Sequence, residues 1–107
     1  MADVVRYFAK SDVALLNSGS FRTDEIIPTG IIKWKDIDTL FPIVDSVLII
    51  RTCGENLLKA LENGVSAVPK LEGRFPSVSG VRFKFDSSKP AFERITEITV
   101  NGKPLNK

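Results

Sequence analysis

The segment Asp12–Arg22 constrains the fold most, because it joins a strand pattern directly to a polar turn. Val13–Leu16 is an unbroken apolar run, which is typical of a short strand buried on both faces. Asn17-Ser18-Gly19-Ser20 follows at once and has high turn propensity, and Arg22 adds a permanent cation. An amide, a flexible backbone and a guanidinium in one place suit a polar ligand, especially a phosphate. Such a pattern more often comes from a strand and a turn in which the Asn side chain caps its own backbone and the Arg side chain is solvated.

Helical and strand patterns alternate along the front of the chain, and strand patterns dominate its rear. Apolar residues at helical spacing predict helices at Ala2–Ala9, Trp34–Phe41 and Glu55–Val65. Apolar or alternating runs predict further strands at Val47–Ile50, Val81–Asp86 and Ile95–Val100. Val47–Ile50 is the strongest of these and is expected at the centre of its sheet. The order indicates one α+β domain over residues 1–107, with a mixed sheet and packed helices.

The remaining segments are expected to be turns and loops. Pro69–Gly80 carries several Pro and Gly residues and is predicted to be irregular. Asn101-Gly102 favours a tight type I′ hairpin, so that the residues after it return beside Ile95–Val100. Both ends of the chain look abrupt. Strand edges left open there predict that two copies can pair as a homodimer.

Individual side chains can also be placed from the pattern. In the helix at Glu55–Val65, Leu61 belongs to the apolar face and Glu62 to the face turned towards water, and Gly64 is the expected stop. Glu55 and Lys59 form an i, i+4 pair in the favourable order. Two apolar residues are expected to be at least partly buried, namely Cys53 and Trp34.

The composition argues against an active site within these residues. The chain has 107 residues, one Cys and no His, whereas most metal-assisted hydrolases and Ser/His/Asp hydrolases use imidazole. Asp and Glu are scattered without convergent spacing, so neither a metal site nor an acid–base pair is predicted. A lone Cys53 gives no metal-ligand spacing and no internal disulfide.

Charge and hydropathy exclude two kinds of partner. The net charge of +2 and the lack of a basic run argue against nucleic acid. No apolar stretch approaches the roughly 20 residues that span a bilayer. The N-terminal residues Met-Ala-Asp-Val-Val-Arg do not have the layout of a signal peptide.

Four motifs occur in order over nearly the whole chain. They are Asp12-Val-Ala-Leu-Leu-Asn17-Ser-Gly-Ser-Phe-Arg22; Gly30-Ile-Ile-Lys-Trp-Lys-Asp-Ile with Leu40-Phe-Pro42-Ile43-Val-Asp45-Ser; Gly54-Glu-Asn-Leu-Leu-Lys-Ala-Leu-Glu-Asn-Gly-Val-Ser66; and Gly73-Arg-Phe-Pro-Ser-Val-Ser-Gly80-Val-Arg-Phe-Lys-Phe-Asp86. The first is close to the Ala-Asp-hydrophobic-Asn-Gly-Gly-x-Arg signature of the 5′-nucleotidase family. Together the four resemble the C-terminal domain of that family.

The resemblance implies that these residues are part of a larger enzyme. In the family, an N-terminal metallophosphoesterase domain, rich in His and Asp, holds two metal ions and hydrolyses nucleoside monophosphates or related phosphate esters. The C-terminal domain binds the nucleotide. By this resemblance the chain itself has no catalytic residue and no cofactor, and its divalent metals belong to an upstream domain in cis. Family members are often periplasmic, secreted or on the cell surface, and the compartment of this protein stays open.

Four residues correspond to nucleotide-binding positions of the family. By the resemblance, Asn17 hydrogen-bonds the base and Arg22 contacts the phosphate, while Gly19 keeps the turn open to the ligand. Ile43 stands where the family has the Phe that stacks on one face of the base. An amide offers a donor and an acceptor together, and a guanidinium matches a phosphate with two parallel hydrogen bonds.

Departures from the family pattern leave a second hypothesis open. Ile43 gives no aromatic stacking, and Ser18 and Ser20 stand where the family more often has Gly. The family's second aromatic lies in a Gly-Gly-Asp-Gly-aromatic stretch that these residues do not contain. The alternative is a diverged binding or interaction module that kept the fold and lost nucleotide recognition.

Overall fold

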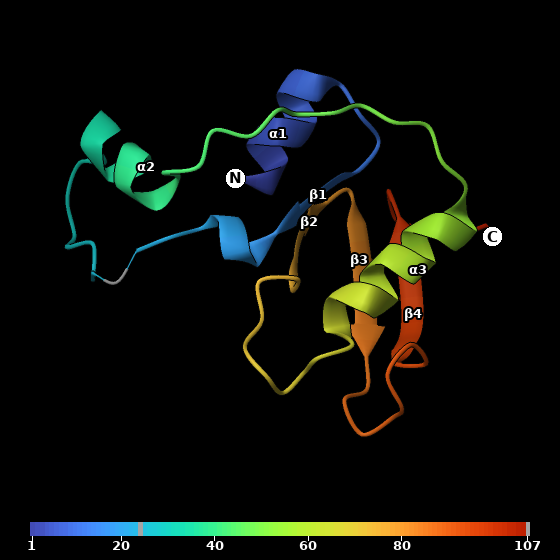
Figure 1. Cartoon of the computed structure of the whole chain (residues 1–107). Helices are drawn as coiled ribbons and strands as arrows, with labels where there is room; N and C mark the ends of the chain where they lie inside the picture. The colour runs from blue at the N-terminus through green and yellow to red at the C-terminus, as the bar shows by residue number, and fades with distance from the viewer. Residues whose placement is uncertain (24, 107) are drawn as a thin grey trace.

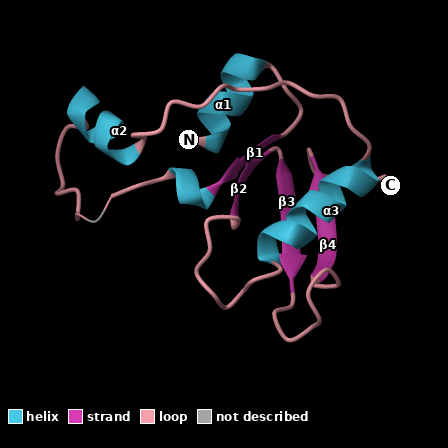
Figure 2. Cartoon of the chain, viewed as in Figure 1, coloured by secondary structure: helices cyan, strands magenta, loops and turns pink. Residues whose placement is uncertain are grey.

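Helices and two small antiparallel sheets make up the part of the chain that the computed structural model describes, residues 1–23 and 25–106. Figure 1 labels these elements, and Figure 2 separates helices from strands by colour. In chain order they are α1 (Ala2–Ala9), β1 (Ala14–Asn17), the 3-10 helix η1 (Ser18–Ser20), α2 (Trp34–Leu40), α3 (Gly54–Val65), β2 (Pro76–Ser79), β3 (Val81–Phe85), β4 (Ile95–Val100) and β5 (Lys103–Pro104). The predicted α+β class is confirmed.

The strands pair into two sheets, both antiparallel, in place of the one mixed sheet that was expected. β1 pairs with β2, in a register that sets Ala14 opposite Ser79 and Asn17 opposite Pro76. β3, β4 and β5 form the second sheet in that order. β2 and β3 follow each other through Gly80, whose positive φ of 76° makes the bend between the two sheets.

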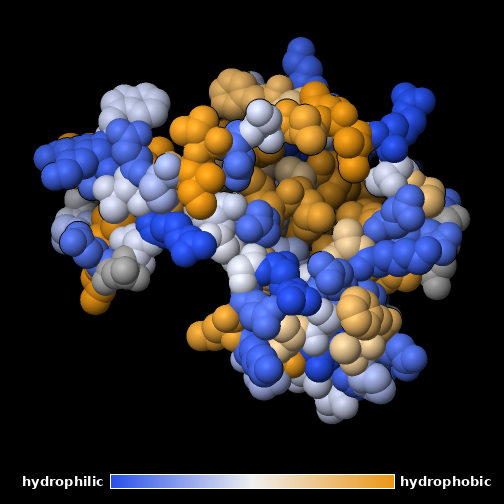
Figure 3. Space-filling view, in the orientation of Figure 1, coloured by the Kyte–Doolittle hydropathy of each residue, from blue (hydrophilic) through white to orange (hydrophobic). Residues whose placement is uncertain are grey.

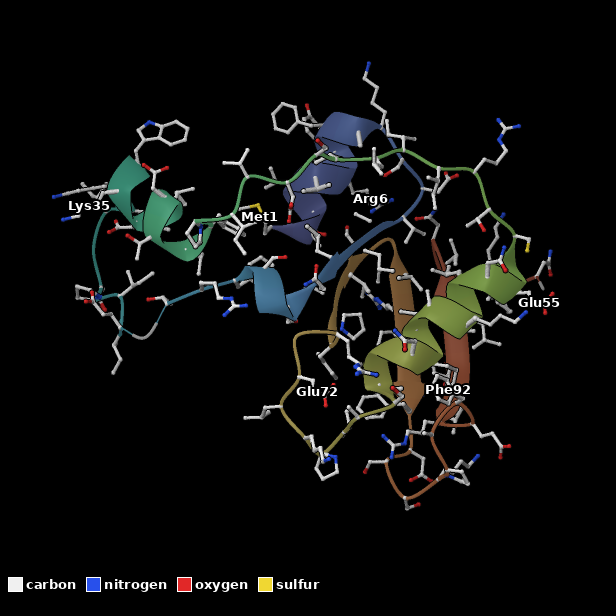
Figure 4. All side chains as sticks on the ribbon, in the orientation of Figure 1. Met1, Arg6, Lys35, Glu55, Glu72 and Phe92 are labelled. Carbon is white, nitrogen blue, oxygen red and sulfur yellow. The ribbon has the colours of Figure 1, made fainter. Side chains whose placement is uncertain are left out.

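The rear of the chain matches its sequence pattern closely. β3 and β4 cover the two predicted strands, and Asn101 and Gly102 have φ values of 49° and 79°. A type I′ turn needs positive φ at both central positions, so the predicted hairpin is confirmed. Arg6 of α1, labelled in Figure 4, donates a hydrogen bond of 2.9 Å from Nη2 to Asn101 Oδ1 and ties α1 to this hairpin.

α3 lies against β4 (Figure 1) and is held there by a buried polar cluster. Leu61 and Val65 on this helix are fully buried. Glu62 is only 7% exposed, so the prediction that it faces water is wrong. Its two carboxylate oxygens accept hydrogen bonds from the backbone N–H groups of Arg94, at 3.0 Å, and Ile95, at 2.7 Å. Helical periodicity alone cannot predict the burial of Glu62, because its hydrogen-bond partners are backbone groups far along the chain.

Arg94 completes the cluster from the strand side. Its Nη1 donates to the carbonyl oxygens of Val65, at 2.5 Å, Ser66, at 3.1 Å, and Val68, at 2.8 Å. These carbonyls lie at and beyond the C-terminal end of α3, where carbonyls lack partners within the helix and a cation is favourable. Gly64, expected to stop the helix, lies buried inside it, and the helix ends at Val65 with Ser66 in a right-handed conformation.

The centre of the chain departs most from its prediction. Val47–Ile50, expected to be a central strand, belongs to an irregular connection between α2 and α3, and these residues are 63–81% exposed. β2, by contrast, lies within the stretch 69–80 that was expected to be irregular. Trp34 is 84% exposed and Cys53 is exposed, so both burial predictions are wrong. The Glu55–Lys59 pair is present at 2.7 Å.

The cluster on α3 leads to a stability prediction. Replacing Glu62 by Ala leaves the backbone N–H groups of Arg94 and Ile95 without their acceptor in a largely buried site. We expect E62A to lower the free energy of unfolding by about 2–4 kcal/mol in urea titrations. The matched control is E97A, which removes an exposed cross-strand ion pair with Lys84 and should cost at most about 1 kcal/mol. Equal losses in the two variants would contradict the structural role of Glu62.

Candidate functional site

The turn after β1 is held in place by the loop before β2. Ser18 N donates to Phe75 O at 2.8 Å, and Gly19 N donates to Gly73 O at 2.9 Å. These bonds continue the antiparallel pairing of β1 and β2 beyond the end of the strands. The predicted turn is therefore a short 3-10 helix with fixed neighbours.

Gly19 is needed at this turn because two backbones meet there. A Cβ atom on Gly19 would lie 2.6 Å from Gly73 Cα, and a Cβ on Gly73 would lie 3.0 Å from Gly19 Cα. The first distance is far inside van der Waals contact, so no side chain fits without a shift of the backbone. Gly19 thus has a packing role here, and its predicted role of keeping the turn open to a ligand stays a prediction.

Arg22 is anchored at one end of its guanidinium and exposed at the other. Its Nε donates to Gly19 O at 2.8 Å, and its backbone N donates to Leu40 O at 2.9 Å. Among the described residues, no hydrogen bond or ion pair involves its terminal nitrogens Nη1 and Nη2. The turn therefore orients a cation whose two outer nitrogens can still bind an anion.

Asn17 and Ile43 border one large cavity, of about 1430 Å³. Figure 3 shows a hollow lined by hydrophobic side chains at the centre of this face. Asn17 Oδ1 accepts a hydrogen bond from Ser20 Oγ at 3.1 Å, and Ser20 also borders the cavity. Gly19 and Arg22 are not among the lining residues. The structure thus brings two of the four predicted site residues to one cavity and leaves the other two on the turn beside it.

Two aromatic residues of the same region were not singled out from the sequence. Phe21 and Phe41 border this cavity together with Asn17 and Ile43. Their rings meet edge to face, with centroids 5.1 Å apart and planes at 82°. Their position in the sequence could have pointed to them, because Phe21 directly precedes Arg22 and Phe41 lies two residues before Ile43. The ring pair also joins the turn to the end of α2, whose ribbon lies apart from the two sheets in Figure 1.

Neither a metal centre nor a membrane span is found in the described part of the chain. Residues 1–23 and 25–106 hold no group of three or more His, Cys, Asp or Glu side chains that could bind a metal ion. In the same residues no helix is long and apolar enough to cross a bilayer.

The contact between the two glycines can be tested directly. G19A should displace the loop around Gly73 and lower the free energy of unfolding by about 1–3 kcal/mol. G30A is the matched control, because a Cβ on Gly30 meets no atom within 4 Å, and it should change stability by less than about 1 kcal/mol. Both can be measured by thermal and urea unfolding. A G19A protein as stable as G30A would contradict the close contact.

Comparison with known proteins assigns the family. The model of the 5′-nucleotidase C-terminal domain matches residues 1–107. A crystal structure of a 5′-nucleotidase precursor from Thermus thermophilus superposes with a TM-score of 0.80 at 30% identity, covering 98% of this chain and 22% of that one.

Three curated relatives agree with this result. They are the trifunctional nucleotide phosphoesterase protein YfkN of Bacillus subtilis (26% identical over 92 residues), Protein 5NUC of Lutzomyia longipalpis (28% over 94) and the 5′-nucleotidase of Rattus norvegicus (26% over 90). The matches cover 82–86% of this chain but only 6–16% of these relatives. The predicted resemblance is confirmed, and the chain belongs to the family of 5′-nucleotidase C-terminal domains.

Proposed function

We propose that this chain is the nucleotide-binding part of a 5′-nucleotidase that hydrolyses nucleoside monophosphates or related phosphate esters. The observation that carries the proposal is the anchored guanidinium of Arg22, whose outer nitrogens have no partner among the described residues, beside the cavity that Asn17 borders. Two relatives are named for nucleotide phosphoesterase and 5′-nucleotidase activity, which supports the same ligand class.

Arg22 contacts the phosphate in this proposal. Its Nε is already engaged by Gly19 O, so the planar guanidinium is oriented before the ligand arrives. Nη1 and Nη2 then present two N–H donors to phosphate oxygens, and little side-chain freedom is lost on binding. In this proposal the phosphate is held at the turn by Arg22, and an upstream domain would supply the metal ions for hydrolysis.

Asn17 recognises the base from the cavity side. Its Oδ1 is engaged by Ser20 Oγ at 3.1 Å, which leaves the two N–H donors of Nδ2 for acceptors on a nucleobase. Ile43, half exposed at 51%, offers one apolar contact to the base. Phe41, in the same lining, supplies an aromatic surface that Ile43 itself does not.

Hydrolysis belongs to another part of the enzyme in this proposal. An upstream metallophosphoesterase domain in cis holds the divalent ions in this proposal. The described residues of this chain contain no cluster of His, Cys, Asp or Glu side chains that could bind them. The chain's own residues bind and orient the nucleotide.

The alternative is a diverged module that has the fold without nucleotide recognition. Two observations favour it: Ile43 replaces the stacking Phe of the family, and Arg22 does not border the cavity that Asn17 and Ile43 share. The two functions predict different effects of the same substitution.

Substitution of Arg22 separates the two functions. In the intact nucleotidase, R22A removes a charge-assisted contact to phosphate and should raise KM for AMP about tenfold or more. R82A is the control, because Arg82 is an exposed arginine on β3, and it should leave KM unchanged. Steady-state phosphate release measures both. An unchanged catalytic efficiency in R22A would favour the diverged module.

The isolated chain should not hydrolyse nucleotides. Residues 1–107, incubated with AMP and Mg²⁺, Mn²⁺ or Zn²⁺, are expected to release no more inorganic phosphate than buffer with the same metal. The physical reason is that residues 1–23 and 25–106 hold no cluster of metal ligands and that the sequence contains no His. Metal-dependent turnover that is retained after repeated purification would refute the division of labour.

A further inference from the structure

We propose that Ser20 is a positioning residue whose hydroxyl holds the Asn17 amide, so that the site selects nucleotides whose base offers a hydrogen-bond acceptor. This role of Ser20 rests on the proposed function and names the residue and the kind of base that determine its specificity. Ser20 belongs to η1, the short turn that follows β1 in Figure 1, and it borders the same cavity as Asn17.

Asn17 stands at the N-cap position of η1 but does not cap it. An Asn at this position ordinarily accepts a hydrogen bond from the backbone N–H two or three residues further on. Here the side chain makes no such bond, and Gly19 N, two residues on, donates to Gly73 O at 2.9 Å instead. The loop before β2 thus takes a donor that the Asn17 side chain could have used. The structure lacks the self-capping that the sequence pattern more often indicates.

The Asn17 side chain is held by Ser20 instead of by the backbone. Ser20 Oγ donates a hydrogen bond of 3.1 Å to Asn17 Oδ1. The donating hydroxyl meets the carbonyl oxygen of the amide, and the amide nitrogen Nδ2 lies at the other end. Among residues 1–23 and 25–106, no hydrogen bond engages Nδ2. Asn17 therefore keeps two free N–H donors at the border of the cavity, whereas its acceptor is already in use.

Ser20 itself is held on a fixed turn. The N–H of Gly19, the residue before it, donates to the loop that precedes β2. Phe21, the residue after it, donates from its backbone N to Ser18 O at 3.1 Å and closes the turn. Ser20 is half-buried, whereas Asn17 is exposed. A hydroxyl on a fixed turn restrains an amide that would otherwise rotate in solvent, so less side-chain freedom is lost when a base binds.

Two free donors select a base that carries an acceptor. The ring nitrogens of adenine accept hydrogen bonds, whereas its exocyclic amino group donates them. A base that turned only donors towards Asn17 would leave Nδ2 without a partner in the complex, which is unfavourable. A phosphate ester without a base makes no use of the pair formed by Asn17 and Ser20. The selection thus acts on the base and leaves the phosphate contact of Arg22 unchanged.

Removal of the hydroxyl tests the role of Ser20 in the intact nucleotidase. S20A should raise KM for AMP about three- to tenfold and leave kcat unchanged, because a base contact serves substrate and transition state alike. The inhibition constant of ribose 5-phosphate, which has no base, should not change. S20T keeps the hydroxyl and should keep the wild-type KM. S18A is the matched control, since Ser18 lies on the same turn but does not border the cavity.

Analogues of AMP test the acceptor on the base. The 1-deaza, 3-deaza and 7-deaza analogues each replace one ring nitrogen by C–H and so remove one acceptor. In the wild-type enzyme, one of them should have a KM about three- to tenfold above that of AMP. In S20A this ratio should fall below about twofold, because the amide is no longer held for the acceptor that the analogue lacks. In S18A the ratio should stay as in the wild type.

Three results would overturn the role of Ser20 and leave the proposed function in place. The first is a wild-type KM for AMP in S20A when R22A raises it. The second is an equal rise of KM for AMP and of the inhibition constant of ribose 5-phosphate in S20A, which would mean that the whole turn had moved. The third is the same deaza ratio in S20A as in the wild type. A wild-type KM in both S20A and R22A would instead refute the proposed function, and the role of Ser20 with it.

Discussion

The exchange of hydrogen bonds between α3 and the start of β4 is the constraint on which the rest of the structure depends. Glu62 accepts from the backbone N–H groups of Arg94 and Ile95, just before and at the start of β4, and Arg94 donates to three carbonyls at and just beyond the end of α3. Each charged side chain thereby satisfies backbone groups of the other element. Burial of an acid and a base without these bonds would be unfavourable. With them, α3 is fixed across the second sheet.

The position of the candidate site follows from this attachment. The chain leaves α3 through Ser66 and Val68, whose carbonyls Arg94 holds, and continues into the loop around Gly73. That loop holds the turn at Gly19 and then becomes β2, the partner of β1. The buried hydrogen-bonded cluster of Glu62 and Arg94 thus helps to determine where the turn that carries Asn17 and Arg22 lies. Side chains that would never touch a ligand set the geometry of those that we propose to bind it.

The local sequence pattern was sufficient to predict the elements whose apolar period or turn residues lie within the element itself. α1, α2, α3, β3, β4 and the hairpin at Asn101 were predictable from period and turn chemistry, and the four motifs identified the family. β2 was missed because Pro76 and two serines resemble a loop, and only pairing with β1 makes them a strand. The prediction of a strand at Val47–Ile50 was wrong for the opposite reason. Strand propensity is a preference for a partly buried pleated surface, and the described residues provide no strand beside this segment. Glu62 and Gly73 depend on distant backbone, which no local pattern can reveal.

Arg22 donates one hydrogen bond from its main chain and another from its side chain. Its main-chain N–H holds the end of α2 through Leu40 O, whereas its side chain belongs to the turn through Gly19 O. The first bond is made by any residue except proline, and only the second depends on which side chain is present. The charge offered to a ligand at this position can therefore change during evolution while the hydrogen bond to α2 is kept. Loss of nucleotide recognition in one lineage and its retention in another are then both compatible with a single fold.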